Sequence, residues 1–69
     1  MLNATHTTRE QTRALDTWRD AESLVASRWR VFLDARGANR ARAFASYVAA
    51  LDAEEAAAGE VALLSDLAA

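Results

Sequence analysis

Residues 29–48 read WRVFLDARGANRARAFASYV, and this stretch decides the fold. A single glycine, Gly37, separates two segments that are rich in strong helix formers. Glycine readily adopts the left-handed conformation that ends helices, and Asn39 is a favourable N-cap for a following helix. Because so short a connection places two helices side by side and antiparallel, the stretch predicts a helical hairpin.

The composition extends this prediction to the whole chain. The 69 residues include eighteen alanines, eight leucines and eight arginines, no proline, and only four valines, which favours helices over strands. We expect one all-α domain over residues 1–69, with a helix at about 8–36, a turn at 37–39 and a helix at about 40–67. Thr7 and Glu10 have the spacing of a capping box at the first helix start. Gly59 leaves two alternatives open: the second helix ends there before a short third helix, or it continues, as we favour, with a kink or with room for Trp18 at the glycine.

Large apolar residues follow each predicted helix at alternating intervals of three and four, which is the spacing of a face that packs on a partner helix. A turn centred on Ala38 pairs Phe32 with Phe44 and Trp29 with Tyr47 and Val48. The predicted core comprises Leu15, Trp18, Val25, Trp29, Phe32, Phe44, Tyr47, Val48 and Leu51.

A second apolar set lacks partners inside this predicted hairpin. Residues 63–67 face residues 9–13, which are all polar. Unpartnered apolar surface usually marks an interface, and a chain this short needs extra packing because it has no cysteine for a disulfide. We therefore expect a homodimer that forms a four-helix bundle. The predicted self-association residues are Leu24, Val31, Leu63, Leu64 and Leu67.

Catalytic and metal chemistry find little support in the residues. Glu22 is predicted to face Glu54 and Glu55, but di-metal carboxylate bundles add Glu-x-x-His pairs, and the lone histidine is His6. We interpret these carboxylates as a polar layer and expect no catalytic residues, no metal and no cofactor. The serines likewise have no histidine within a helix to act as a base.

Charge is distributed unevenly. All eight arginines lie between Arg9 and Arg42, so residues 1–43 carry +3, while residues 44–69 carry −5. The arginines of the first helix and turn suggest an alternative function as a small nucleic-acid-associated regulator. The net charge of −2 argues against it, because such proteins usually carry a basic footprint.

The favoured function is a protein–protein interaction or scaffolding module. Its expected partners are a second copy of itself and another protein, with no membrane, because no apolar run approaches the length of a membrane span. The start of the chain lacks the basic and apolar regions of a signal peptide, so a cytoplasmic location is expected.

The segment RAFASYVAALDAEE, residues 42–55, resembles short uncharacterised helical-hairpin proteins of actinobacteria. The resemblance covers most of the chain and implies a bacterial helical hairpin, with no function attached. In size and hairpin shape the chain is also similar to the secreted WXG-type proteins. Its turn, residues 36–39, lacks their Trp-x-Gly motif, so that function is not carried over.

Overall fold

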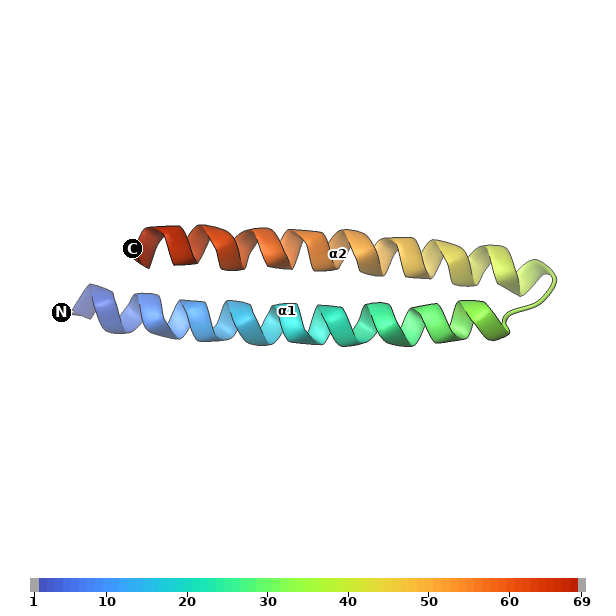
Figure 1. The fold of residues 1–69 in the computed structure, drawn as a ribbon, viewed down its shortest axis with the longest axis horizontal. Coiled ribbons are helices and arrows are strands. Elements are labelled where there is room, and N and C mark those ends of the chain that lie inside the picture. The colour runs from blue at the N-terminus through green and yellow to red at the C-terminus, as the bar shows by residue number, and fades with distance from the viewer. Residues whose placement is uncertain (1, 69) are drawn as a thin grey trace.

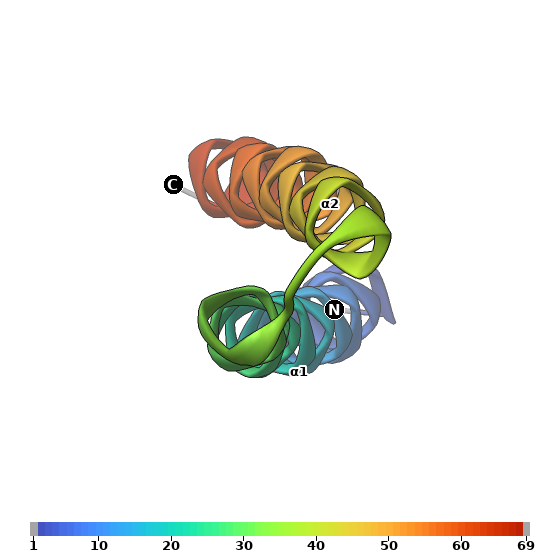
Figure 2. The ribbon, with the colours of Figure 1, turned by 90° about the vertical axis from the view of Figure 1, so that its right-hand side faces the viewer.

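The computed structural model describes the backbone of residues 2–68 and the side chains of residues 8–67. Two helices, α1 (Leu2–Asp34) and α2 (Ala38–Ala68), run antiparallel, and the N-terminal end of α1 extends beyond the end of α2 (Figure 1). The described residues contain no strand, which confirms the predicted all-α hairpin. The Cα atoms extend 57 Å along the long axis and only 13 Å and 12 Å across it. Viewed from the turn, the two helices lie side by side, and no third element of the described chain lies against them (Figure 2).

The turn comprises residues 35–37, two residues earlier than predicted. Gly37 has a φ of 58°, in the left-handed region that side chains with a Cβ avoid. The amide of Arg40 donates to the Gly37 carbonyl at 3.1 Å, so α2 begins directly after the glycine. Asn39 therefore lies inside the first turn of α2 and is not its N-cap, which corrects the predicted boundary.

The N-terminal boundary of α1 also differs from the prediction. The helix begins at Leu2 and passes through residues 7–10, so the predicted capping box does not start it. The side chain of Thr7 lies outside the described residues. The hydroxyl of Thr12 donates to the Thr8 carbonyl at 3.0 Å, a bond typical of a backbone that is already helical there.

Gly59 neither ends nor breaks α2, which runs through it without interruption. A Cβ added to Gly59 would meet no atom within 4 Å, so the glycine does not make room for Trp18. Its main energetic effect in the helix is the greater conformational freedom of glycine in the unfolded chain.

The two glycines should respond to alanine with opposite signs. Gly59→Ala should stabilise the protein by about 0.5–1 kcal/mol, because it raises helix propensity in open space. Gly37→Ala should destabilise it by about 1–2 kcal/mol, because alanine is strained at a φ of 58°. Urea unfolding of the two variants measures both effects, and a destabilised Gly59→Ala would contradict the continuous helix.

Alanines occupy the line along which the helices touch. In α1 most of the less exposed positions follow a heptad spacing, at Gln11, Ala14, Trp18, Ala21, Val25 and Phe32, and Ala35 of the turn continues it. In α2 the same spacing runs through Ala43, Tyr47, Ala50, Glu54, Ala57, Val61 and Leu64. Among the described side chains, the buried ones are Ala14, Ala43 and Ala50. The hairpin is therefore held by a heptad contact with small residues at its centre.

Three contacts define how the helices are aligned. The ring centroids of Trp29 and Tyr47 lie 5.0 Å apart, and those of Phe32 and Phe44 lie 5.4 Å apart, so both predicted aromatic pairs are confirmed. Near the open end, the Gln11 side-chain amide lies 3.5 Å from the Leu64 carbonyl, to which it donates.

This alignment places a large residue of one helix opposite an alanine of the other. By the heptad spacing, Trp18 faces Ala57, Val25 faces Ala50 and Phe32 faces Ala43. Large residues facing small ones let the helices approach closely without voids, as a well-packed interior requires. The sequence pattern predicts that Trp18 faces Ala58 and Gly59. The structure places Ala57 opposite Trp18, one residue before the predicted neighbours.

Candidate interaction surface

An exposed aromatic and aliphatic surface lies beside the contact line in the half of the hairpin nearer the turn. Four side chains on this surface are 37–56 % exposed: Trp29, Leu33, Phe44 and Val48. We call this set the aromatic face. Trp29, Phe44 and Val48 were predicted core residues, whereas the other predicted core residues, Leu15, Trp18, Val25, Phe32, Tyr47 and Leu51, are half-buried.

Contacts within the hairpin hold the rings of the aromatic face in place. Trp29 packs on Phe32 at 5.4 Å between centroids, and Phe44 lies 6.4 Å from Tyr47. The Arg40 guanidinium stacks over the Phe32 ring at 4.4 Å, a favourable cation–π distance. The rings are thus fixed before any partner arrives, which lowers the entropy cost of binding.

The opposite side of the hairpin carries a sparser apolar set. Four residues predicted for self-association are 42–70 % exposed: Leu24, Val31, Leu63 and Leu67. We call this set the leucine face. The fifth predicted residue, Leu64, is half-buried on the contact line, where its carbonyl accepts the Gln11 hydrogen bond.

Shallow grooves run beside the contact line on both sides. On the side of the leucine face, a groove of about 530 Å³ near the turn is lined by Val31, Ala35 and Ala43 together with Arg28, Asp34 and Arg42. On the side of the aromatic face, a groove of about 260 Å³ lies at the open end. We call it the threonine groove, and its lining residues are Thr8, Gln11, Thr12, Leu15, Val61 and Ser65.

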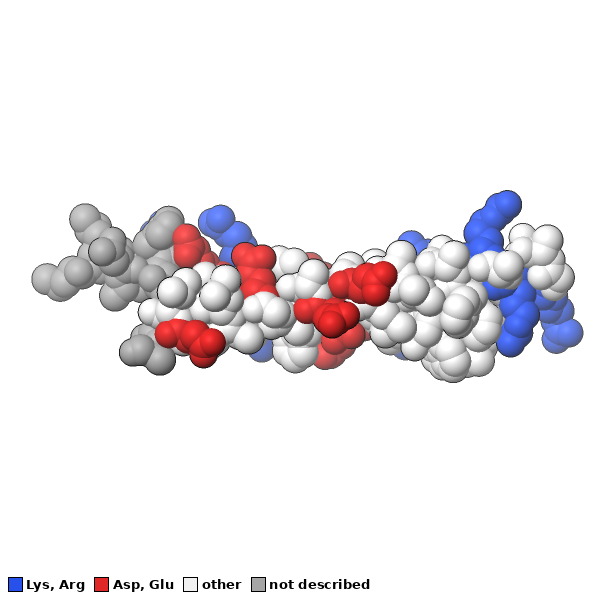
Figure 3. Space-filling model, turned by 90° about the horizontal axis from the view of Figure 1, so that it is seen from above, with Lys and Arg blue, Asp and Glu red and all other residues white. Residues whose placement is uncertain are grey.

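The two ends of the hairpin carry opposite charge. Figure 3 shows acidic side chains along the middle and open end of α2 and arginines gathered at the turn. Residues 26–50 contain five arginines and one aspartate, a net charge of +4. The remaining described residues contain three arginines and nine carboxylates, a net charge of −6. The molecule is therefore a rod with a strong charge asymmetry along its length.

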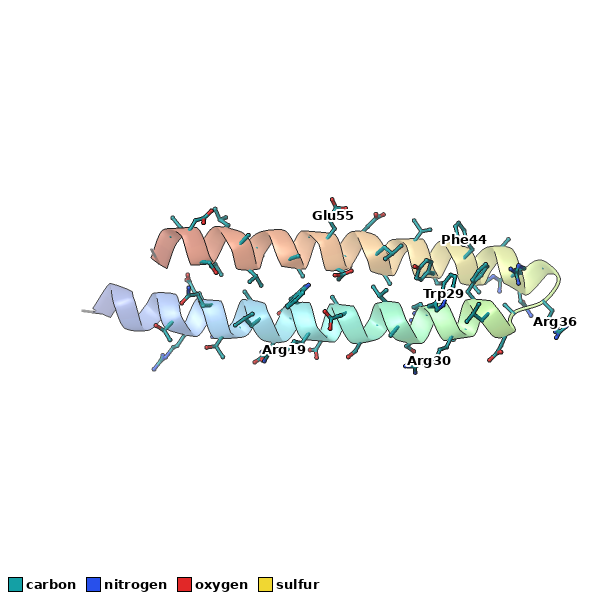
Figure 4. The ribbon with its side chains drawn as sticks, viewed as in Figure 1. Arg19, Trp29, Arg30, Arg36, Phe44 and Glu55 are labelled. Atoms are coloured by element: carbon teal, nitrogen blue, oxygen red, sulfur yellow. The ribbon has the colours of Figure 1, made fainter. Side chains whose placement is uncertain are left out.

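The predicted carboxylate layer does not assemble. Glu22 is exposed beside the contact line, and Glu55 is exposed and points away from α1, whereas Glu54 is half-buried on the contact line opposite Ala21 (Figure 4). The contact line passes through Ala21 because alanine packs more closely than glutamate, so Glu22 is displaced to the flank. No group of three or more potential metal-ligand side chains occurs in the described part of the chain.

Trp18 has a polar atom without a partner. Its indole Nε1 is buried but makes no hydrogen bond, although a buried N–H normally finds one. Trp18 therefore contributes packing against Ala57, while its N–H adds a desolvation cost.

Trp18→Phe should leave the free energy of unfolding within about 1 kcal/mol of the original, because the lost ring volume is offset by removal of the unpaired N–H. Trp18→Ala should cost about 3 kcal/mol, since it also leaves a cavity opposite Ala57. Thermal or urea unfolding distinguishes the two. Equal losses in both variants would show that the N–H has a partner in solution.

Comparisons with protein-family models, curated proteins and solved structures found no match to this chain. Neither described helix contains a stretch long and apolar enough to cross a membrane.

Proposed function

We propose that this protein is a small self-associating helical module for protein–protein interaction or scaffolding, not an enzyme, and that two copies form a four-helix bundle. The observation that carries the proposal is the excess of exposed surface. The hairpin exposes 5397 Å², against roughly 4,200 Å² for a compact monomer of this size.

The excess is of the right size for a dimer. It amounts to roughly 1,100 Å², and a stable interface buries roughly 800 Å² on each partner. Much of it is apolar, because eight large hydrophobic side chains are exposed while the buried side chains of the described residues are those of three alanines. A second hairpin laid along one side would supply the core that two helices lack.

The aromatic face supports this proposal better than the leucine face. It combines four large exposed side chains within a short length of both helices, next to fixed rings. The leucine face is split, because Leu24 and Val31 lie on α1 while Leu63 and Leu67 lie near the end of α2. We therefore assign self-association to the aromatic face and leave the leucine face outside the bundle.

Self-association should appear as a melting temperature that depends on concentration. Binding between folded copies stabilises the folded state by mass action, so the melting temperature should rise by several degrees between about 5 and 500 μM protein. Sedimentation equilibrium should give a dimer mass at the upper concentration. A monomer throughout, with a constant melting temperature, would contradict the proposal.

The arginines near the turn favour one second candidate, a nucleic-acid-associated regulator. The +4 charge of residues 26–50 could contact phosphates, although the −6 charge of the other half opposes a long nucleic-acid footprint. Titration with single-stranded and duplex RNA and DNA distinguishes this regulator from the protein–protein interaction module. Nucleic-acid binding that persists at physiological salt would favour the regulator. Loss of all nucleic-acid binding at that salt concentration would favour the interaction module.

A further inference from the structure

The exposed side chains and the grooves together specify how two copies would meet. We propose that the aromatic face of each hairpin packs into the threonine groove of a second copy, so that the turn of one copy lies over the open end of the other. This inference rests on the proposed self-association and adds its orientation.

The aromatic face and the threonine groove lie on the same side of the rod. Side chains seven residues apart on a heptad helix share a face. Thr8, Leu15 and Trp29 are separated by multiples of seven, and so are Thr12 and Leu33. In α2 the same holds for Phe44 and Ser65. A second copy on this side would therefore meet both the aromatic face and the threonine groove.

The aromatic face and the threonine groove are also at matching distances from the middle of the rod. A two-fold axis across the hairpin near residues 20 and 55 reverses one copy relative to the other. It carries residue 29 to the level of residue 12 and residue 33 to the level of residue 8. In α2 it carries Phe44 to the level of Ser65, and Val48 to the level of Val61. The exposed rings and Leu33 thus arrive at the threonine groove.

Large and small side chains are complementary near the axis. It places Leu51 over Ala58 and Leu15 over Ala26 of the second copy. Each of these large side chains meets a small one, as on the contact line within the hairpin. With both turns at the same end, Trp29 would instead meet Tyr47 and Val48 of the second copy, and bulky residues would meet bulky ones.

The charges of the two halves are complementary in the same orientation. Reversal lays the +4 half of one copy over the −6 half of the other, whereas turns at the same end would stack like charges. Near the axis, Arg19 comes level with Glu22 of the second copy, and both side chains are exposed in the hairpin. The axis also brings Glu55 level with Glu54 of the second copy, but Glu55 is exposed, so salt screens their repulsion.

A distance between spin labels tests the orientation directly. The chain has no cysteine, so Asn39→Cys carries a single label at an exposed position beside the turn. In the proposed dimer the labelled backbone positions lie roughly 50 Å apart, from the helical rise per residue. With both turns at the same end they lie within roughly 20 Å, from the spacing of packed helices. The short distance would overturn the proposal.

A mixing experiment tests the contact near the axis. Arg19→Glu and Glu22→Arg should each weaken the dimer about tenfold, because each places like charges across the axis. An equimolar mixture should recover the original affinity as a heterodimer, seen by native mass spectrometry. Each variant carries two like charges at residues 19 and 22 of its own chain, and mixing does not change this. Recovery of affinity in the mixture therefore reports only the contact between the two copies.

The outcomes separate the two proposals. If the original protein dimerises but the mixture shows no preference for the heterodimer, the orientation is wrong and self-association stands. If the original protein is a monomer at about 500 μM, the proposed function fails and the orientation fails with it. Circular dichroism of each variant confirms that the exposed substitutions leave the helices intact.

Discussion

Replacing Ala50 with leucine should destabilise the hairpin by about 1–3 kcal/mol, the usual cost of overfilling a packed interior. Ala50 is only 4 % exposed, the lowest exposure among the buried alanines, and it faces Val25 across the contact line. A longer side chain there must push the helices apart along their length. The melting temperature should fall by about 4–8 °C for each kcal/mol lost.

Ala49→Leu is the matched control. It adds the same atoms to the neighbouring residue, which is exposed, and both substitutions change helix propensity equally. Its free energy of unfolding should stay within about 0.5 kcal/mol of the original. If the two variants were equally stable, alanine would not lie at the centre of the contact line.

Removing the aliphatic side chains of the aromatic face should abolish dimerisation while leaving the hairpin helical. In Leu33→Ser/Val48→Ser, each copy loses two exposed side chains that the dimer would bury, so four are lost per dimer. At about 1.5 kcal/mol or more for each, the dissociation constant should rise more than about a thousandfold. Sedimentation velocity across a concentration series measures the change.

The matched control is Leu63→Ser/Leu67→Ser on the leucine face. These side chains are 58 % and 70 % exposed, at least as much as Leu33 and Val48, so both double variants remove similar apolar surface from the hairpin. The control should keep its dissociation constant within about threefold, because rim or uninvolved positions contribute little to affinity. If only the control variant dissociated, the interface would lie on the leucine face and not on the aromatic face.

The sequence alone determined the hairpin and its alignment. Helix-forming residues without proline, divided by Gly37, leave antiparallel helices as the simplest fold, and the aromatic pairs follow from the position of the turn. Such features depend on local propensity and spacing, which are properties of the chain itself.

Only the tertiary structure decided which side chains lie between the helices. The prediction followed the large apolar residues and so placed Glu22, Trp29 and Phe44 between the helices. In the structure these three side chains are exposed beside the contact line, and the neighbouring Ala21 and Ala43 lie on it. Alanine is ambiguous in a sequence because it favours helices everywhere. Its recurrence every seven residues at Ala43, Ala50 and Ala57 was the available signal. Close packing of two helices favours small side chains opposite large ones on the contact line, and it leaves the rings of Trp29 and Phe44 on the flank, where they are exposed.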